Sequence, residues 1–201
     1  MGDASTHNMP EHDTLTDQTL QFQGRSLRLI GGTTRAARVL AKMLEGKHGI
    51  SGLRVVELGA GVGLIAQCLV ILGSEVWCTD QPPVLDLLKE NIQKNLSVEE
   101  LSRTHVMPLY WGDEADIATL DHETFPEIDL LIGSDLIFAR ENNADLFRTI
   151  KSLCRPGKRV IMSFTRRFIS EEDFFVLMDE FFIEESWVND GDVSIVTWLR
   201  S

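Results

Sequence analysis

The chain contains the segment Val55-Val56-Glu57-Leu58-Gly59-Ala60-Gly61-Val62-Gly63-Leu64, which runs from a β-branched strand through three alternate glycines into a helix. The residues before the glycines are mostly apolar, as is typical of a buried strand, and those after them recur at helical spacing. Glycine has no Cβ, so it suits a backbone that turns tightly or that a ligand approaches closely. We therefore expect a strand, a ligand-binding turn and a helix in this order.

Short apolar runs alternate with helical stretches along the rest of the chain. Strand-like runs lie at 54–58, 75–79, 105–109, 129–133, 159–164, 183–188 and 194–199, and helix-like segments lie at 63–72, 83–95, 142–153 and 170–182. Alternating apolar residues on both sides of Gln23-Gly24 predict a β-hairpin that begins at Leu20, and a helix is predicted over 33–47. This order is typical of an α/β fold with a doubly wound, Rossmann-like sheet, here seven-stranded and preceded by a β-hairpin.

Composition excludes several classes of protein. The chain has 201 residues, 43% of them apolar, which is enough for one globular domain with a full core. Asp and Glu number 31 against 19 Lys and Arg, a formal net charge of −12. This balance argues against a nucleic-acid partner and against an anionic membrane surface, and the apolar runs are too short for a membrane helix.

The ends of the chain and its cysteines indicate how it is organised and where it resides. Residues 1–19 are polar without apolar periodicity, so we expect a flexible N-terminal tail followed by a single domain over 20–201. The first residues have no secretory leader pattern. Three widely spaced cysteines, Cys68, Cys78 and Cys154, fit neither a disulfide framework nor a zinc site. We expect reduced cysteines, no metal, and a cytoplasmic protein that can also be nuclear.

The glycine segment allows two interpretations. It resembles the E-x-G-x-G-x-G loop of S-adenosylmethionine enzymes, in which no pyrophosphate is bound. A dinucleotide-binding loop needs its third glycine at position 64, where this chain has Leu64. The alternative is that the glycines only make a tight turn between strand and helix.

Candidate site residues follow three other strand runs, where a doubly wound sheet binds its ligands. Asp80 lies 21 residues after Gly59, from where a carboxylate accepts hydrogen bonds from ribose hydroxyls; alternatively, it caps the next helix. Trp111 can stack on an adenine face or be a plain core residue. Asp135 either faces the catalytic edge of the sheet or caps the helix that follows.

Together these motifs resemble methyltransferase family 16, the small seven-β-strand protein-lysine methyltransferases. The resemblance spans roughly residues 20–200 and rests on the order and spacing of five motifs, which are Glu57 to Leu64, Thr79-Asp80, Leu87-Leu88-Lys89-Glu90-Asn91, Trp111-Gly112 and Gly133-Ser134-Asp135-Leu136-Ile137-Phe138. It implies a class I S-adenosylmethionine-dependent methyltransferase fold, with S-adenosyl-L-methionine as cofactor and S-adenosyl-L-homocysteine as product.

The resemblance also implies roles for individual residues. Cofactor contacts fall on the residues Thr34, Glu57, Gly59, Ala60, Gly61, Asp80, Trp111 and Ser134. Asp135 and Phe138 occupy the D-x-x-Y segment at the mouth of the substrate channel and are the expected catalytic residues. The chain departs from the family at two places: Thr34-Arg35 stands where Trp-Asp is usual, and Phe138 stands where tyrosine is usual.

We therefore expect an S-adenosylmethionine-dependent protein methyltransferase that acts on a lysine side chain. The resemblance implies a protein substrate of the chaperone, elongation-factor or AAA ATPase class, and we expect a monomer. Because of the two departures, two alternatives stay open. One is a methyltransferase that acts on protein arginine or histidine, and the other is a catalytically silent module that binds S-adenosylmethionine.

Overall fold

The computed structural model describes residues 16–124, 128–166 and 171–201. Two antiparallel strands, β1 (Gln18–Phe22) and β2 (Arg25–Leu29), form a separate hairpin. The remaining strands are β3 (Arg54–Leu58), β4 (Glu75–Asp80), β5 (Thr104–Pro108), β6 (Leu130–Ser134), β7 (Arg159–Thr165), β8 (Phe182–Asp190) and β9 (Val193–Arg200). The helices are α1 (Arg35–Glu45), α2 (Leu64–Ile71), α3 (Pro82–Asn95), α4 (Val98–Leu101), α5 (Glu114–Glu123), η1 (Arg140–Asn142), α6 (Asn143–Leu153) and α7 (Glu171–Asp179).

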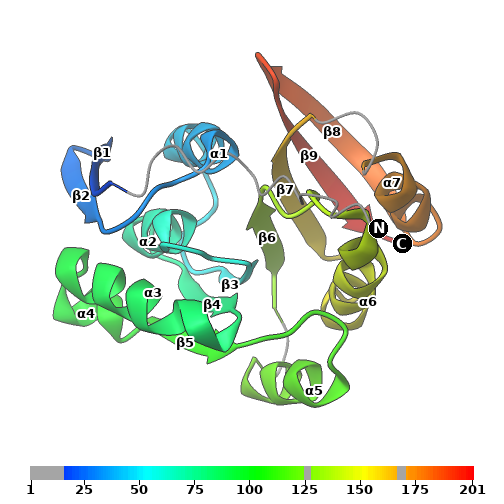
Figure 1. Cartoon of the computed structure of the whole chain (residues 1–201), viewed down its shortest axis with the longest axis horizontal. Coiled ribbons are helices and arrows are strands. Elements are labelled where there is room, and N and C mark those ends of the chain that lie inside the picture. Colours follow the sequence, from blue (N-terminus) through cyan, green and yellow to red (C-terminus); the bar gives the residue numbers. More distant parts are fainter. Residues whose placement is uncertain (1–15, 125–127, 167–170) are drawn as a thin grey trace, which may run out of the picture.

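Seven strands form the central sheet in the order β5-β4-β3-β6-β7-β9-β8 (Figure 1). Neighbouring strands from β5 to β7 are parallel, and β9 is antiparallel to both β7 and β8. The chain builds the sheet outward from β3 to β5 and then crosses to β6 on the other side of β3. A sheet of this kind binds ligands at such a reversal, beyond the carboxyl ends of the strands.

Helices cover both faces of this sheet because successive strand residues point to opposite faces. Val55 belongs to the core beneath α1, α2 and α3, whereas Val56 belongs to the core beneath α5, α6 and α7. Leu130 and Leu131 divide between the two cores in the same way. The hairpin adds Leu27 and other side chains to the first core, so it packs on the α1–α3 side (Figure 1).

The sheet and hairpin confirm the fold class predicted from the sequence, with some differences in detail. β1 begins at Gln18, within the predicted tail, whose residues 1–15 lie outside the described residues. The last helix ends at Asp179 rather than Phe182, which instead begins β8. Helix α5 was not predicted, because Ile117 and Leu120 are its only buried residues. Among the described residues, no helix combines the length and apolar character needed to cross a membrane.

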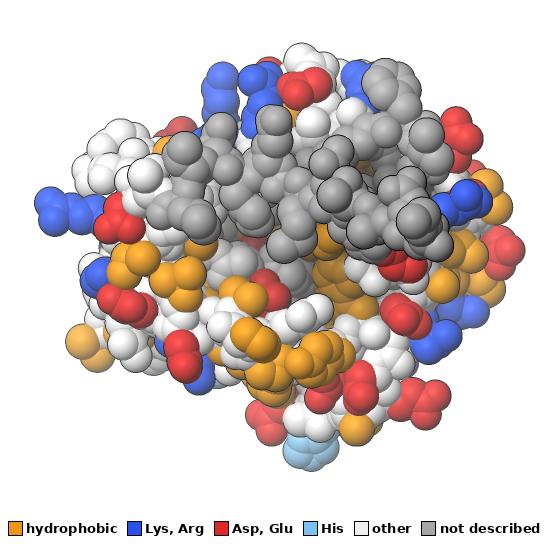
Figure 2. All heavy atoms as spheres, viewed as in Figure 1, with side chains coloured by type: hydrophobic (Ala, Val, Ile, Leu, Met, Phe, Trp, Pro, Cys, Tyr) orange, Lys and Arg blue, Asp and Glu red, His pale blue; other side chains and the backbone are white. Residues whose placement is uncertain are grey.

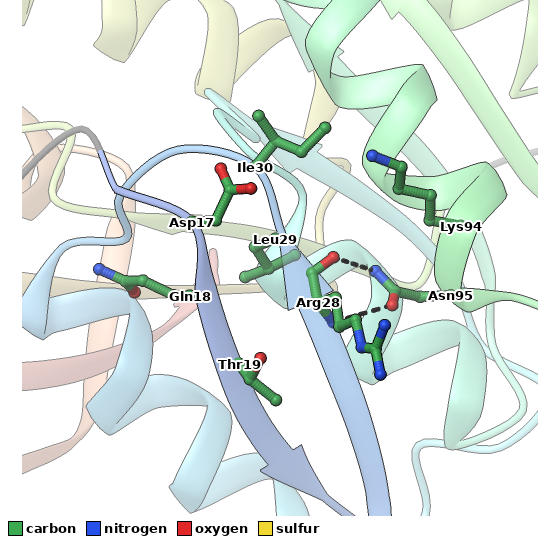
Figure 3. Close-up of a pocket in the computed structure, with 8 residues that line it drawn as sticks. All are labelled: Asp17, Gln18, Thr19, Arg28, Leu29, Ile30, Lys94 and Asn95. Atoms are coloured by element: carbon green, nitrogen blue, oxygen red, sulfur yellow. Dashed lines mark hydrogen bonds between the residues drawn. The ribbon is translucent and has the colours of Figure 1, made fainter.

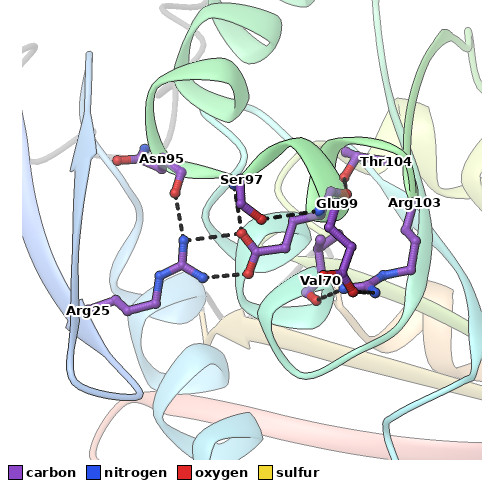
Figure 4. A network of polar contacts seen from close by, with 8 residues as sticks. Arg25, Val70, Asn95, Ser97, Glu99, Arg103 and Thr104 are labelled. Atoms are coloured by element: carbon purple, nitrogen blue, oxygen red, sulfur yellow. Dashed lines mark hydrogen bonds and ion pairs between the residues drawn. The ribbon is translucent and has the colours of Figure 1, made fainter.

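A polar network fastens the hairpin to the end of α3 (Figure 4). The Arg25 guanidinium donates to both carboxylate oxygens of Glu100 and, over 2.7 Å, to the Asn95 carbonyl. Glu100 also accepts from the Ser97 N–H at 2.8 Å, while the Ser97 hydroxyl accepts from the Glu100 N–H. Burial alone would raise the pKa of the Glu100 carboxyl, but the hydrogen bonds from Arg25 and Ser97 lower it below its usual value.

Glu100→Gln is therefore expected to reduce the free energy of unfolding by about 1 kcal/mol at pH 7. A carboxyl with a lowered pKa stabilises the fold above its unfolded-state pKa and loses this contribution as the pH falls through the folded-state value. The difference between variant and wild type should thus vanish in acid. Urea denaturation at several pH values measures it. Glu99→Gln is the control, because the Glu99 side chain is 84% exposed in its pair with Arg103; an equal effect of both variants would contradict the network.

Candidate active site

A cavity of about 670 Å³ opens at the reversal of strand order between β3 and β6. Its walls come from the carboxyl ends of β3, β4, β5 and β6, from the segment before α1, and from the start of α6. All ten residues that the sequence assigned to the cofactor or to catalysis line it, namely Thr34, Glu57, Gly59, Ala60, Gly61, Asp80, Trp111, Ser134, Asp135 and Phe138. The topology thus brings together side chains that lie up to 104 residues apart in the sequence.

The glycine loop forms the floor of the cavity in a left-handed backbone. Gly59, Gly61 and Gly63 have φ values of 61°, 54° and 85°, which residues with a Cβ rarely adopt. A Cβ at Gly59 would lie 2.6 Å from Leu136, and one at Gly63 would lie 2.6 Å from Leu88. A Cβ at Gly61 would meet no atom within 4 Å and would point into open space. The first and third glycines therefore serve close packing, and the second keeps the cavity free.

Asp80 holds this loop in place from the end of β4. Its Oδ2 accepts from the Gly61 N–H at 2.7 Å, and its Oδ1 accepts from the Gln81 N–H at 2.7 Å. Burial raises the pKa of the Asp80 carboxyl, against the lowering effect of these two N–H groups. Helix α3 begins with Pro82 and Pro83, which have no N–H to be capped. The carboxylate therefore supports the loop, and each oxygen retains capacity to accept a further hydrogen bond.

Glu57 is a buried carboxylate that lines the cavity beneath the glycine loop. The residue is 1% exposed, and its Oε2 has no hydrogen-bond partner among the described residues. Burial raises the pKa of the Glu57 carboxyl well above its usual range, and the Asp80 charge raises it further, against a hydrogen bond from the Ala66 N–H. An unpartnered buried carboxylate is costly unless a cation pairs with it. This position therefore fits a cationic ligand group.

Thr34 lines the cavity and is the N-cap of α1. Its hydroxyl accepts from the Ala37 N–H at 3.1 Å and caps the helix. Strand β7 is bonded to the same helix, because the Ser163 hydroxyl donates to the Ala36 carbonyl in α1 at 3.0 Å. The residue that replaces the usual family tryptophan is thus fixed at the cavity by its capping bond.

Trp111 and Ser134 follow β5 and end β6, respectively. Trp111 is only partly buried, and its ring comes within 3.5 Å of a Cβ built on Gly59, so it stands beside the glycine loop. The next residue, Gly112, has a φ of 79° and donates its N–H to the Thr149 hydroxyl at 2.9 Å, which fixes the turn that carries the indole. Trp111 is therefore a wall of the cavity rather than a plain core residue.

Asp135 is held in a strained conformation at the end of β6. It is 5% exposed and has a φ of 56°, which costs a residue with a side chain about 1–2 kcal/mol. Its N–H donates to the Ser163 carbonyl at 2.6 Å, and its Oδ1 accepts from the Thr165 N–H at 3.2 Å. The following helices η1 and α6 have Ala139 and Asn142 as their N-caps, so the capping alternative for Asp135 is wrong.

Several further residues of the cavity were not predicted. Asn142 and Asp145 reach it from the start of α6, and Tyr110 reaches it from the turn after β5, where it is 45% exposed. A Cβ on Gly112 would lie 2.6 Å from Asp145 Oδ1, so the turn after β5 packs closely against the start of α6. The sequence gives only a weak signal for the pair on α6, because polar residues at a helix start are commonly solvated caps.

Comparison with known structures agrees with this architecture. The chain superposes on a magnesium protoporphyrin IX methyltransferase of Synechocystis with bound S-adenosylmethionine, at a TM-score of 0.61 and 20% identity, over 82% of this chain and 78% of that one. It also superposes on the glycopeptide N-methyltransferase MtfA complexed with sinefungin, at a TM-score of 0.60 and 12% identity, over 82% and 92%. The chain therefore has the fold of these methyltransferases.

Sequence comparison gives the family. The family model described as lysine methyltransferase matches residues 16–181, so the chain belongs to the lysine methyltransferase family. It is 31% identical to a mouse protein N-lysine methyltransferase, METTL21A, over 84% of this chain and 77% of that protein. The zebrafish METTL21A is 32% identical over 75% and 67%. The EEF1A lysine methyltransferase 3 of Xenopus tropicalis is 32% identical over 71% and 61%.

The residues present fit S-adenosylmethionine, the cofactor of this class. The Glu57 Oε2 atom, which has no partner among the described residues, suits the ammonium group of the cofactor's amino-acid part, and the open face of Gly61 leaves room for a ligand against the backbone.

Gly61→Val is expected to abolish binding of S-adenosylhomocysteine, because the new side chain would fill the cavity floor. A side chain at positive φ costs about 1–2 kcal/mol of stability as well, so this cost needs a control. Gly157→Val is matched: Gly157 has a φ of 82°, no atom lies within 4 Å of its Cβ position, and it is not among the cavity residues. Isothermal titration should show normal affinity for Gly157→Val and none for Gly61→Val. Equal affinities would place the ligand elsewhere.

Glu57→Gln is expected to stabilise the free protein at neutral pH while weakening cofactor affinity by about 10- to 100-fold. A carboxyl whose pKa is raised by folding lowers stability as the pH rises above its unfolded-state pKa, and a neutral amide removes this penalty. The amide also removes the charge that would pair with the cofactor ammonium. Thermal melting at pH 7 and pH 4 and titration with S-adenosylhomocysteine measure both effects. A melting temperature that falls equally at both pH values would contradict the assignment.

Proposed function

We propose that this cavity is where the chain transfers a methyl group from S-adenosylmethionine to a lysine side chain of a protein. One observation carries the proposal. A left-handed glycine loop, a buried carboxyl group with one unpartnered oxygen, and Asp135, a strained acidic residue, line one cavity at the reversal point of the sheet. Strained backbone at the carboxyl end of a strand is common at functional sites. Membership of the lysine methyltransferase family supports lysine as the target.

On the cofactor side, we assign roles by charge and shape. Glu57 would pair with the cofactor ammonium, and the backbone from Gly59 to Gly61 would hold the methionine portion. Asp80 accepts hydrogen bonds from the ribose hydroxyls with the oxygen capacity that its two backbone bonds leave over. Trp111 lies against the adenine face, and Thr34 and Ser134 contribute hydroxyls to the walls.

On the substrate side, Asp135 and Phe138 act on the lysine amine. The cofactor supplies the methyl group, which passes from sulfur to the lysine nitrogen. A lysine has to lose its proton before it attacks, because its ordinary pKa is about 10.4. Phe138 lines the cavity with an apolar ring, and desolvation beside it would favour the neutral amine. The Asp135 carboxylate orients the amine by accepting its N–H groups, and positioning dominates the rate of such a transfer.

The finer identity of the substrate is part of the same proposal. We place it among chaperones, elongation factors or AAA ATPases, and we place the chain as a monomer in the cytoplasm, with the nucleus as a further location. A relative named EEF1A lysine methyltransferase 3 supports an elongation factor. The net charge of −12 favours approach of a basic segment that contains lysine. On the face seen in Figure 2, acidic and basic side chains of the described residues are interspersed. This argues against a continuous basic patch that would bind a polyanion there.

Methylation of a cell extract tests the proposal directly. The purified chain and isotope-labelled S-adenosylmethionine are incubated with the extract, and labelled proteins are digested and sequenced by mass spectrometry. We expect methyl groups on lysine, and none when Gly61→Val replaces the wild type. Methyl groups on arginine or histidine would contradict the lysine assignment and leave the methyltransferase assignment standing. Cofactor binding without any labelled product would favour the silent module.

Asp135→Asn is expected to lower the rate of methylation by about two orders of magnitude and to leave cofactor affinity within a few-fold. Asparagine tolerates the left-handed backbone, so the variant removes the charge and keeps the conformation. Asp135→Gly should relieve the strain but also lose the hydrogen bond that Asp135 Oδ1 accepts from the Thr165 N–H. Gln23→Gly is the matched control, because Gln23 has a φ of 49° in the hairpin turn away from the cavity. Normal turnover by Asp135→Asn would refute this role.

A further inference from the structure

Helix α3 carries two asparagines, Asn91 and Asn95, that pair with the free edge of the hairpin. They lie four residues apart and therefore on one face of the helix. A carboxamide presents an acceptor and a donor side by side, as one residue of a neighbouring strand would. The Arg28 N–H donates to the Asn95 side chain, and the Ile30 N–H, two residues further on, donates to the Asn91 side chain. The helix thus takes the place of a third strand.

The Asn95 side chain pairs with the hairpin at Arg28. Its Oδ1 accepts from the Arg28 N–H at 2.9 Å, and its Nδ2 donates to the Arg28 carbonyl at 2.9 Å (Figure 3). The second hydrogen of Nδ2 goes to the Asn91 carbonyl, one turn back on the same helix, at 2.9 Å. These bonds lie beside a smaller hollow of about 420 Å³ that is lined by β1, β2 and the end of α3.

Asn91 makes the same pairing and adds a bond that Asn95 lacks. Its Oδ1 accepts from the Ile30 N–H at 2.7 Å, and its Nδ2 donates to the Ile30 carbonyl at 3.1 Å. The second hydrogen of Nδ2 goes to the Val62 carbonyl in the glycine loop at 3.0 Å. Asn91 is fully buried, so water does not replace any of these bonds. One side chain therefore joins the hairpin to the glycine loop.

The two segments that Asn91 joins both line the active-site cavity. Ile30 leads directly into Gly31, Gly32, Thr33 and Thr34, which line one wall, and Val62 belongs to the other. The walls already approach closely, because a Cβ on Gly31 would lie 3.2 Å from Val62 Cγ1. Leu88, one turn before Asn91, packs against Gly63 on the same side of the loop. Helix α3 therefore contacts both the segment before α1 and the glycine loop.

We propose that Asn91 is a positioning residue for the cofactor: its carboxamide fixes the separation between the segment 30–34 and the glycine loop. The proposal rests on the assignment of this cavity to S-adenosylmethionine. Asn91 does not line the cavity itself and acts through the backbone of the two walls. Its loss would leave the Ile30 N–H and the carbonyls of Ile30 and Val62 without their buried partner, and the walls would move apart or relax.

Asn91→Ala and the matched control Asn95→Ala test this inference. Each removes one carboxamide that pairs with the hairpin, and only the first removes the bond to Val62. We expect the dissociation constant for S-adenosylhomocysteine to rise about tenfold or more in Asn91→Ala and to stay within about twofold in Asn95→Ala. Amide exchange followed by NMR should be faster at Gly61 and Gly63 in Asn91→Ala alone. Melting temperatures report the structural cost of each variant, which we expect to be larger in Asn91→Ala because Asn91 is fully buried and the bonds between Asn95 and Arg28 are exposed.

The outcomes separate this inference from the proposed function. Wild-type protein that binds no S-adenosylhomocysteine refutes the cavity assignment, and the exchange rates at Gly61 and Gly63 then still decide whether Asn91 holds the loop. Normal affinity and normal exchange in Asn91→Ala, or equal effects of both variants, overturn the inference. If Asn91→Ala fails to fold, wild-type exchange decides instead. The ligand should slow exchange of the Ile30 amide and leave the Arg28 amide unchanged, and no change at Ile30 overturns the proposal.

Discussion

The hydrogen bond from the Gly61 N–H to the Asp80 carboxylate is the constraint on which the cavity depends. The parallel pairing of β3 with β4 ends at Leu58 and Thr79, and the Ala60 N–H still donates to the Thr79 carbonyl at 2.9 Å. The backbone is left-handed at Gly59 and again at Gly61, and the Gly61 N–H donates to the Asp80 side chain at 2.7 Å. The Asp80 side chain thus extends the hydrogen-bond pattern of β3 and β4 by one bond. The glycine loop therefore stays open and does not fold over the ends of these strands.

The same arrangement makes the free protein less stable than its fold would allow. Burial raises the pKa values of both Glu57 and Asp80, and the Asp80 charge raises that of Glu57 further. Replacing such buried charges by neutral groups is often stabilising, whereas a cation that pairs with them repays part of their desolvation. A cationic ligand therefore stabilises the folded state by mass action, and the stability of the fold is linked to the cofactor that it binds. The Glu57 Oε2 atom, which has no hydrogen-bond partner among the described residues, is the atom with which such a cation would pair.

The site residues that directly follow a strand in the sequence could be predicted from the sequence. The glycine loop, Asp80 and Asp135 each follow a strand directly, and strand ends meet at one edge of a parallel sheet, so their convergence could be predicted without coordinates. Asn91 could not be assigned a role in this way, because its partners lie 61 and 29 residues away and are chosen by the packing of α3. Helix α5 escaped prediction because it buries too few apolar residues to show a helical period.

The two departures from the family pattern leave the cavity intact, which bears on whether the chain is a silent binding module. Thr34 caps α1, and Arg35 begins that helix and donates from Nε to Asp192 at 2.8 Å in the turn between β8 and β9. This ion pair is half exposed and contributes little stability, but it fixes the turn beside the start of α1. Phe138 keeps an aromatic wall and lacks only a hydroxyl, while Asp135 is held by the backbone of β7 independently of it. Neither substitution removes a group that holds the loop, the carboxylates or the strained aspartate, so the architecture favours turnover over silent binding.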